Sequence, residues 1–198
     1  MGSELQLTKS MGRWLGLLIT DGTISKYKRY LKFTNKEKTL LDEFALLTQN
    51  NFNLIGKRIN GTNRTPDIQV NSVHLVKQIN IEFGIPLGDK SNIITVPTKI
   101  LNCKNNEVLS SFLSGVFDGD GSAVFNKKHN IRRVDLTSGS SRFLEQVQEL
   151  LLNFGIESRL AKKETRLLIT KKNDIKRFHK FIGFKHPIRQ KRLLEMLN

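Results

Sequence analysis

Two apolar segments stand out along the chain, at residues 13–23 (RWLGLLITDGT) and 112–122 (FLSGVFDGDGS). Each segment is long enough for three helical turns, contains an internal glycine and ends in an Asp-Gly pair. A glycine inside a helix costs about 1 kcal/mol unless it serves packing. Gly16 and Gly115 occupy the same place in the two segments, so they predict two helices whose backbones touch.

The chain that follows each of these helices repeats one order of elements. In each half the helix precedes two short strands of alternating polarity, an amphipathic helix, two more strands and a final helix. The later helices are expected at residues 38–51, 73–83, 141–154 and 174–182. The pattern predicts an α+β protein made of two pseudo-twofold related halves, each α-β-β-α-β-β-α, with antiparallel sheets.

The repeat also predicts where the chain divides. The halves are expected at residues 1–100 and 108–198, and a connector is expected at about residues 93–107. The connector contains Pro97 and is too short to separate two independent domains.

Alternation along the helices and strands assigns their faces. The helix at residues 141–154 can begin at a Ser140 or Ser141 cap and places five apolar side chains on one face, Phe143, Leu144, Val147, Leu150 and Leu151. In the strands, the apolar residues that should point inward are Leu31, Phe33, Ile68 and Val70. One face of each sheet is therefore predicted to be covered by helices and the other to be polar and open.

The charge and composition of the chain indicate which classes of molecule it can bind. The chain carries 33 Lys and Arg against 18 Asp and Glu, a net charge of +15, which favours a polyanion such as nucleic acid or an anionic membrane surface. The sequence contains neither an apolar run long enough to cross a bilayer nor a signal-peptide core, so we expect an intracellular protein without a membrane partner. Its single cysteine, Cys103, excludes an internal disulfide and a cysteine zinc site.

The Asp-Gly pairs carry the candidate chemistry. Gly22 and Gly121 are expected to take the left-handed conformation that follows many helix ends. Asp21 and Asp120 would then lie side by side at the C-terminal ends of the two packed helices. Two carboxylates repel each other there, next to the negative ends of the helix dipoles. The arrangement predicts a bound cation, and a hard divalent metal suits these oxygen ligands.

The two segments resemble the paired motifs of the LAGLIDADG homing endonucleases. Residues 14–22 (WLGLLITDG) and 113–121 (LSGVFDGDG) both keep the third-place glycine, the eighth-place acid and the final glycine. At the sixth place, Asp118 of the second copy corresponds to Ile19 of the first. Two such motifs, 99 residues apart (120 minus 21) in a basic chain of 198 residues, are far more specific than one.

The resemblance implies a single-chain, monomeric intron-homing enzyme with the motif helices at its centre and two sheets forming a saddle over double-stranded DNA. It implies a metal-dependent, staggered double-strand cut across the minor groove of a long asymmetric site, leaving 3′ overhangs. Asp21 and Asp120 would hold two or three Mg²⁺ ions together with the backbone carbonyls of Thr20 and Gly119.

The resemblance further implies one basic residue in each active site. Lys90 and Arg189 are the candidates, because the 99-residue spacing (189 minus 90) that relates the two aspartates also relates them. Lys57, Lys162 and Lys185 stay as alternatives. Cutting would therefore depend on Asp21, Asp120, Lys90 and Arg189.

The outward strand residues are the expected DNA contacts, because Arg and Lys can pair with guanine and Asn or Gln with adenine. A register shift of one residue would exchange the two faces. The candidates of the first half are Ser25, Lys26, Lys28, Tyr30, Lys32, Thr34, Arg58, Asn60, Gln69 and Asn71. Those of the second half are Asn126, Lys128, Arg133, Asp135, Thr137, Arg159, Lys163, Arg166, Thr170 and Lys172.

Other functions are compatible with the same fold. An intron maturase that binds intron RNA is the alternative, and a basic transcription regulator is a third reading; neither needs both acids. An intein is disfavoured, since no splicing nucleophile opens the chain and no His-Asn pair followed by a nucleophile closes it. The location stays open between an organelle, either mitochondrion or chloroplast, and an archaeal or phage cytoplasm.

Overall fold

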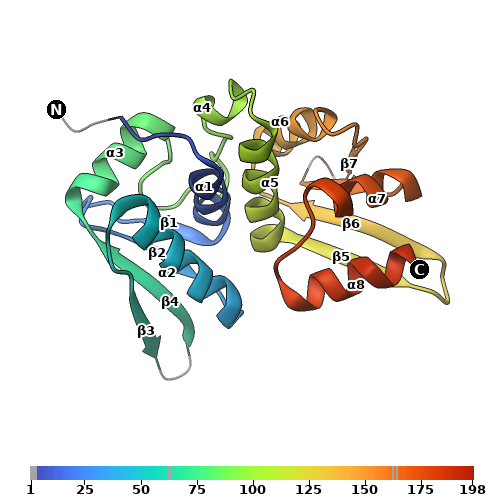
Figure 1. The fold of residues 1–198 in the computed structure, drawn as a ribbon, viewed down its shortest axis with the longest axis horizontal. Coiled ribbons are helices and arrows are strands. Elements are labelled where there is room, and N and C mark those ends of the chain that lie inside the picture. Colours follow the sequence, from blue (N-terminus) through green and yellow to red (C-terminus); the bar gives the residue numbers. More distant parts are fainter. Residues whose placement is uncertain (1–3, 62–63, 162, 164) are drawn as a thin grey trace.

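The computed structural model of the protein describes residues 4–61, 64–161, 163 and 165–198 (Figure 1). The alternative basic residue Lys162 lies outside this part of the chain. The elements of the first half are α1 (Lys9–Asp21), β1 (Gly22–Ile24), β2 (Tyr30–Thr34), α2 (Lys38–Phe52), β3 (Lys57–Gly61), β4 (Arg64–Asn71) and α3 (Val73–Phe83). The short helix α4 (Thr98–Leu101) follows.

The second half repeats this order and adds one helix. Its elements are α5 (Asn106–Asp120), β5 (Gly121–Asn126), β6 (Ile131–Thr137), α6 (Ser141–Leu152), β7 (Arg159–Ala161), β8 (Arg166–Ile169), α7 (Lys172–Phe181) and α8 (Pro187–Leu197). Two antiparallel four-stranded sheets result, ordered β1-β2-β4-β3 and β5-β6-β8-β7. This confirms the predicted α+β fold of two related halves.

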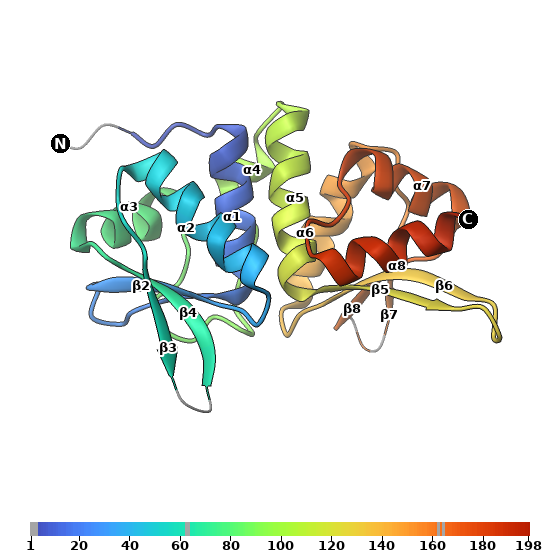
Figure 2. The ribbon, with the colours of Figure 1, turned by 60° about the horizontal axis from the view of Figure 1, so that its bottom comes forward.

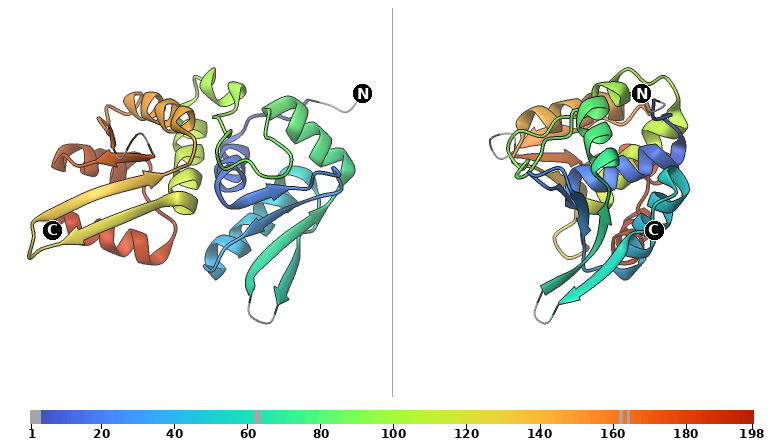
Figure 3. Two further views of the ribbon diagram at one scale, coloured as in Figure 1. Left: turned by 180° about the vertical axis from the view of Figure 1, so that it is seen from behind. Right: turned by 90° about the vertical axis from the view of Figure 1, so that its left-hand side faces the viewer.

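The helices lie on one side of both sheets, and α1 and α5 run side by side at the centre (Figure 2). The β3–β4 and β5–β6 hairpins extend away from these central helices in different directions (Figure 3). The sheet faces that the helices leave uncovered therefore lie on the same side of the molecule and form the predicted saddle. Among the described residues, none of the helices is both long and apolar enough to cross a membrane.

Glycines allow the central helices to touch through their backbones. A Cβ atom on Gly115 would lie 2.7 Å from the carbonyl oxygen of Arg13 and 2.9 Å from the Cα of Gly16. A Cβ atom on Gly12 would lie 2.7 Å from the carbonyl oxygen of Val108. Any larger residue would push the helices apart, so the packing role predicted for Gly16 and Gly115 is confirmed, and Gly12 shares it.

The predicted conformation of the final glycines is wrong. Gly22 has φ −89° and ψ 158°, and Gly121 has φ −85° and ψ 166°, so both are extended and open β1 and β5 directly. Glycine is needed at these corners for space, because a Cβ atom on Gly22 would lie 2.5 Å from Leu18 Cδ1. The same atom on Gly121 would lie 2.9 Å from the Cα of Phe117.

The core lies between the helices and the covered faces of the sheets. The inward residues Leu31, Phe33, Ile68 and Val70 are all buried, as predicted. Ser140 caps α6 by accepting a hydrogen bond from the Phe143 amide, and the five apolar residues predicted for that helical face are buried. The strand alternation of β2 and β4 and the helical period of α6 thus predict the buried faces correctly.

Two helices were not expected from the sequence. The connector contains α4 and ends where α5 begins at Asn106, inside the predicted connector. Helix α8 packs on β5 through a narrow apolar stripe that includes Leu193 and Met196. Most of its other residues are polar, which hid the helical period, although Pro187 at its start is typical of a first helical position.

Candidate active site

Asp21 and Asp120 are the last residues of α1 and α5, where the central helices reach the open side of the saddle. Asn35 Nδ2 donates a hydrogen bond of 2.7 Å to Asp21 Oδ2. Burial raises the pKa of Asp21, and Asn35, Arg189 and Lys90 oppose the rise. The structure therefore brings the two predicted acids and both predicted basic residues into one electrostatic environment.

The carboxylate of Asp120 is the more strongly perturbed of the two. Although Asp120 keeps an exposed surface on the open side, protein atoms surround much of its carboxylate. This partial burial, followed by the charge of Asp21, raises the pKa of Asp120 to about 6, against the opposing charges of Lys90 and Arg189. The two acids lie near enough for one to resist ionisation of the other.

Lys90 and Arg189 bind the C-terminal carbonyls of the central helices. Lys90 Nζ donates to the carbonyl oxygens of Thr20 (3.0 Å) and Gly22 (2.5 Å). Arg189 donates to the carbonyl oxygens of Phe117 (3.1 Å), Asp118 and Gly119 (3.1 Å). Burial lowers the pKa of each basic side chain, and the nearby aspartates oppose the change. The two halves thus place a cation at equivalent helix ends.

The donor set fits a divalent cation. Two crowded carboxylates, one of them with a pKa near 6, are relieved by a positive charge between them. Within the described residues, no cluster of three or more His, Cys, Asp or Glu side chains forms, so further ligands would come from carbonyls or water. Thr20 and Gly119 offer carbonyl oxygens at this point, and each carbonyl can accept a second contact beside its hydrogen bond to Lys90 or Arg189.

A cleft of about 500 Å³ opens beside Asp21 and is shared by the two halves. Asn35 and Lys36 line it from the first half, and His186 and Arg189 line it from the second. Burial, followed by the charge of Arg189, lowers the pKa of His186. The sequence does not indicate Asn35 or His186 as site residues. Asn35 reaches Asp21 because β2 folds back beside the end of α1, and His186 reaches the cleft because the two halves pack together.

The strand register places five of the ten first-half DNA candidates on the open face, namely Tyr30, Lys32, Thr34, Gln69 and Asn71. Thr23, Lys32, Gln69 and Lys57 form one row across the four strands, and Tyr30 pairs with Asn71 and Thr34 with Asp67 in the neighbouring rows. Ser25 is buried and accepts a hydrogen bond from the Tyr27 amide. Lys26 and Lys28 lie in the β1–β2 turn, and the row adds Thr23 and Lys57 to the candidates.

The predicted face of β3 is wrong by one residue. Arg58 pairs with the buried Ile68, so its side chain lies on the helix side, where Arg58 Nη1 contacts Asp42 Oδ1 of α2 at 2.9 Å. Asn60 falls at an irregularity between Ile59 and Gly61. The hairpin sequence gives no apolar alternation at this point, which is why the register could not be assigned beforehand.

The second half follows the prediction more closely. The register places six candidates on the same face of the sheet as Ser122, which is the open face: Asn126, Arg133, Asp135, Thr137, Arg159 and Arg166. Lys128 and Lys163 lie in turns, and Thr170 follows β8. Lys172 is misplaced, because β8 ends at Ile169 and Lys172 is the first residue of α7.

Acidic residues form ion pairs with the Arg and Lys side chains on both open faces. Asp135 is almost fully buried and contacts Arg133 at 2.9 Å and Arg166 at 3.8 Å. Asp67 is also buried, and it contacts Arg64 at 2.9 Å and Lys32 at 3.9 Å. Asp135 therefore holds basic side chains in place and is not itself presented as a free contact.

Comparison with known protein families finds one match in each half of the chain. The profile of the LAGLIDADG-like domain matches residues 8–82 and 107–183. The replication factor C small subunit of Methanocaldococcus jannaschii is 31% identical over 205 residues, which cover 98% of this chain and 10% of that protein. The corresponding subunit of Thermococcus kodakarensis is 30% identical over 195 residues, which cover 94% of this chain and 21% of that protein. The chain thus spans only a small part of the curated relatives it matches.

Solved structures share the fold over most of the chain. The homing endonuclease I-WcaI bound to its DNA recognition sequence superposes with a TM-score of 0.66 at 18% identity, covering 100% of this chain and 88% of that one. I-DmoI in complex with DNA and Ca gives a TM-score of 0.61 at 17% identity, with coverages of 96% and 98%. Full-length DUF199/WhiA from Thermatoga maritima gives 0.65 at 15% identity, with coverages of 100% and 63%. At these identities the likeness shows the fold.

Proposed function

Because the chain belongs to the LAGLIDADG family, we propose that it is a homing endonuclease that makes a metal-dependent double-strand cut in a long asymmetric DNA site. One observation carries the proposal. Asp21 and Asp120 end the two central helices at the junction of two open, basic sheet faces, and each end also receives a cation, Lys90 or Arg189. A protein that only bound nucleic acid would have no need of this pair of crowded acids.

The open faces support binding of double-stranded DNA. The chain has a net charge of +15, and the register places a row of Thr23, Lys32, Gln69 and Lys57 on one uncovered sheet. A two-stranded ribbon fits the major groove, where such side chains can read base edges. Phosphate contacts from the lysines and arginines would hold the register on the duplex.

The same geometry supports a separate site for each DNA strand. Asp21 and Asp120 would hold the divalent ions, with the Thr20 and Gly119 carbonyls beside them. A bound divalent ion supplies charge neutralisation at the phosphate and a water of lowered pKa. Lys90 and Arg189 orient the helix-end carbonyls and place positive charge where a phosphate would lie. Cuts offset between the strands, with 3′ overhangs, would follow from two sites, one at the end of each central helix.

The pattern of relatives supports a mobile module. The matching segment forms 10% of a replication factor C subunit, 18% of a glutamine–fructose-6-phosphate aminotransferase from the same organism and 15% of a probable translation initiation factor IF-2 from T. kodakarensis. These proteins differ in their named roles, so what they share is the segment. Such a distribution is expected for a unit that moves between genes by cutting DNA.

Cleavage of a randomised double-stranded DNA library in Mg²⁺ tests the proposal, and the ends of the products identify the target. We expect selection of a long asymmetric site, with cutting that EDTA stops and that Asp120→Asn removes. Absence of cleavage in both Mg²⁺ and Mn²⁺, or undiminished cleavage by Asp120→Asn, would overturn it. A specific RNA bound more tightly than any DNA at matched salt would instead favour the maturase.

A further inference from the structure

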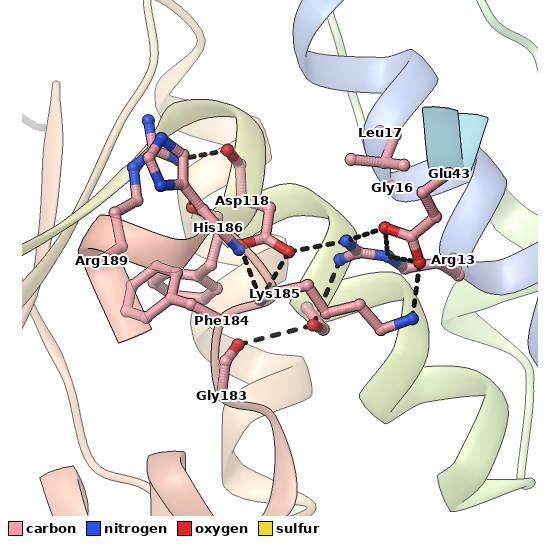
Figure 4. Close-up of polar contacts among 12 residues, drawn as sticks. Arg13, Gly16, Leu17, Glu43, Asp118, Gly183, Phe184, Lys185, His186 and Arg189 are labelled. Carbon is pink, nitrogen blue, oxygen red and sulfur yellow. Dashed lines mark hydrogen bonds and ion pairs between the residues drawn. The ribbon is translucent and has the colours of Figure 1, made fainter. Parts of the chain in front are cut away.

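The sixth-place acid of the second motif, Asp118, is fully buried, with 0% of its surface exposed. Its two carboxylate oxygens accept hydrogen bonds from the Lys185 amide at 3.1 and 3.0 Å, and Oδ1 accepts a third from the His186 amide at 3.0 Å (Figure 4). Oδ2 also contacts Arg13 Nη2 at 2.7 Å. The side chain is thus fully engaged inside the protein and is not presented to a metal on the open face.

The amides that Asp118 holds belong to the segment that carries Arg189. Lys185 and His186 directly precede α8, and Arg189 lies in the first turn of that helix. Arg189 in turn donates to the carbonyls of Phe117, Asp118 and Gly119 at the end of α5. The last turn of α5 therefore contacts this segment at two places. The Asp118 carboxylate binds the amides that precede α8, and the backbone carbonyls of α5 bind the Arg189 side chain.

Ion pairs tie the same anchor to the first half. Arg13 of α1, with 3% of its surface exposed, contacts both Asp118 at 2.7 Å and Glu43 of α2 at 2.6 Å. Glu43 also contacts Lys185 Nζ at 2.5 Å. Burial would raise the pKa of Glu43, but Arg13 and Lys185 hold it below its usual range. The charges alternate along the chain Asp118–Arg13–Glu43–Lys185, which crosses between the halves twice.

We infer that Asp118 is the positioning residue of the second active site: its carboxylate fixes the segment that places Arg189 at the end of α5. The inference rests on the proposed endonuclease function. It assigns a task to a motif position that the first half fills with Ile19, and it makes the placement of Arg189 depend on packing between the halves.

The test compares two variants that differ only in the acceptor. Removing one member of a buried ion pair leaves an uncompensated charge, which would confuse the result. Both variants therefore carry Arg13→Met, and they combine it with Asp118→Asn, which keeps an amide oxygen for the two backbone N–H groups, or with Asp118→Leu, which has the same branching and no acceptor. Ile19→Leu, at the equivalent first-half position, is the matched control.

Two readouts are measured on each folded variant. Hydrogen exchange of residues 184–190 should be roughly tenfold faster or more in the Leu variant than in the Asn variant, because two buried backbone N–H groups lose their acceptor. Nicking of strand-labelled target should fall by roughly tenfold or more on one strand, the strand that Arg189→Met also slows, since small displacements of a site group reduce rate strongly. Ile19→Leu should change neither strand.

Each outcome decides the inference. Equal slowing of both strands, equal behaviour of the Asn and Leu variants, or further slowing when Asp118→Leu is added to Arg189→Met would overturn it. If the Leu variant does not fold, Asp118→Ala in the same background replaces it, since the smaller side chain leaves room for water. If the unaltered protein cuts neither strand, the proposed function fails, whereas unchanged exchange of residues 184–190 refutes the anchor independently.

Discussion

Lys90 and Arg189 reach equivalent helix ends from segments that are supported in different ways. The Lys90 segment is held through its backbone: the Gly88 amide donates to the Ile24 carbonyl of β1 at 2.7 Å, and the Ile94 carbonyl accepts from Ser140 Oγ of the second half at 2.7 Å. The Lys90 carbonyl then accepts from the Ile94 amide at 2.9 Å. The Arg189 segment instead relies on the buried carboxylate of Asp118 and its ion pair with the opposite half.

This difference shows that the two halves share the need for a cation at the helix end but do not share the contacts that position it. The last carbonyls of both central helices have no partner within the helix, and both helix ends lie next to two crowded acids. A positive charge is therefore needed at each end, and a basic residue occurs at the same spacing in each half. The supporting contacts only have to bring that side chain to the right place. A backbone bridge does so in the first half, and a buried acid does so in the second.

The largest effect is expected from the acids themselves. Asp21→Asn and Asp120→Asn should each reduce double-strand cleavage by about a thousandfold or more, because charge stabilisation at the phosphate is lost. DNA binding should stay nearly unchanged, since the sheets hold the duplex. A gel-shift titration and a cleavage time course on the same target measure both quantities. Retention of full activity by either variant would contradict the assignment.

Salt dependence distinguishes the contributions of the two sheets to binding. The logarithm of the affinity should fall with the logarithm of salt concentration by roughly 0.9 per phosphate contact, and several contacts are expected. Lys32→Gln in the first sheet and Arg133→Gln in the second should each make the slope shallower by about one. Lys176→Gln on α7, on the helix side, is the matched control and should leave it unchanged. A slope near zero for the unaltered protein would remove the DNA proposal.

The two basic residues should differ in strand-resolved rates. Lys90 is an ammonium whose pKa is lowered by burial, so it can order a water and share in proton transfer, whereas Arg189 stays charged. Lys90→Met should slow one strand by roughly tenfold to a hundredfold and accumulate nicked DNA, and Arg189→Met should slow the other strand. Strand-labelled nicking assays measure both. If neither variant changes a strand-specific rate, Lys57, Lys162 and Lys185 become the residues to test.

Much of this site can be predicted from the sequence, because the features that form it are local in the chain. Helix period, strand alternation and a glycine at a close backbone contact are visible in sequence, and they predict the central helices, the order of elements and the meeting of Asp21 with Asp120. The shared spacing of 99 residues (189 minus 90) also selects Lys90 and Arg189, and the structure places both at the helix ends.

The remaining features depend on contacts between distant segments. Arg58 faces the helices because Asp42 lies there, and local alternation in β3 does not show this. Gly22 is extended where a left-handed residue was expected, since β1 begins directly after α1. The role of Asp118 requires the 184–190 segment to return to α5, and the approach of His186 to Asp21 requires the two halves to pack. A sequence pattern within one half contains none of this information.

The smallest effect concerns the difference between the two acids. The pKa of Asp120 is raised to about 6 by burial and by Asp21, so the folded, metal-free protein binds this proton more tightly than the unfolded chain does. The stability that Asp120 contributes is therefore fully present below its unfolded pKa of about 4 and is lost as pH rises through about 6. In EDTA, the difference in Tm between the unaltered protein and Asp120→Asn should shift against the unaltered protein over this interval. Asp21→Asn removes one cause of the raised pKa of Asp120 and should move the transition to lower pH.

Calcium should reverse this dependence of stability on pH, because the ion binds the ionised carboxylates and stabilises the folded state most above pH 6. Thermal unfolding at half-unit pH steps measures all three, and a transition at the same pH in Asp21→Asn as in the unaltered protein would show that the two carboxylates do not interact.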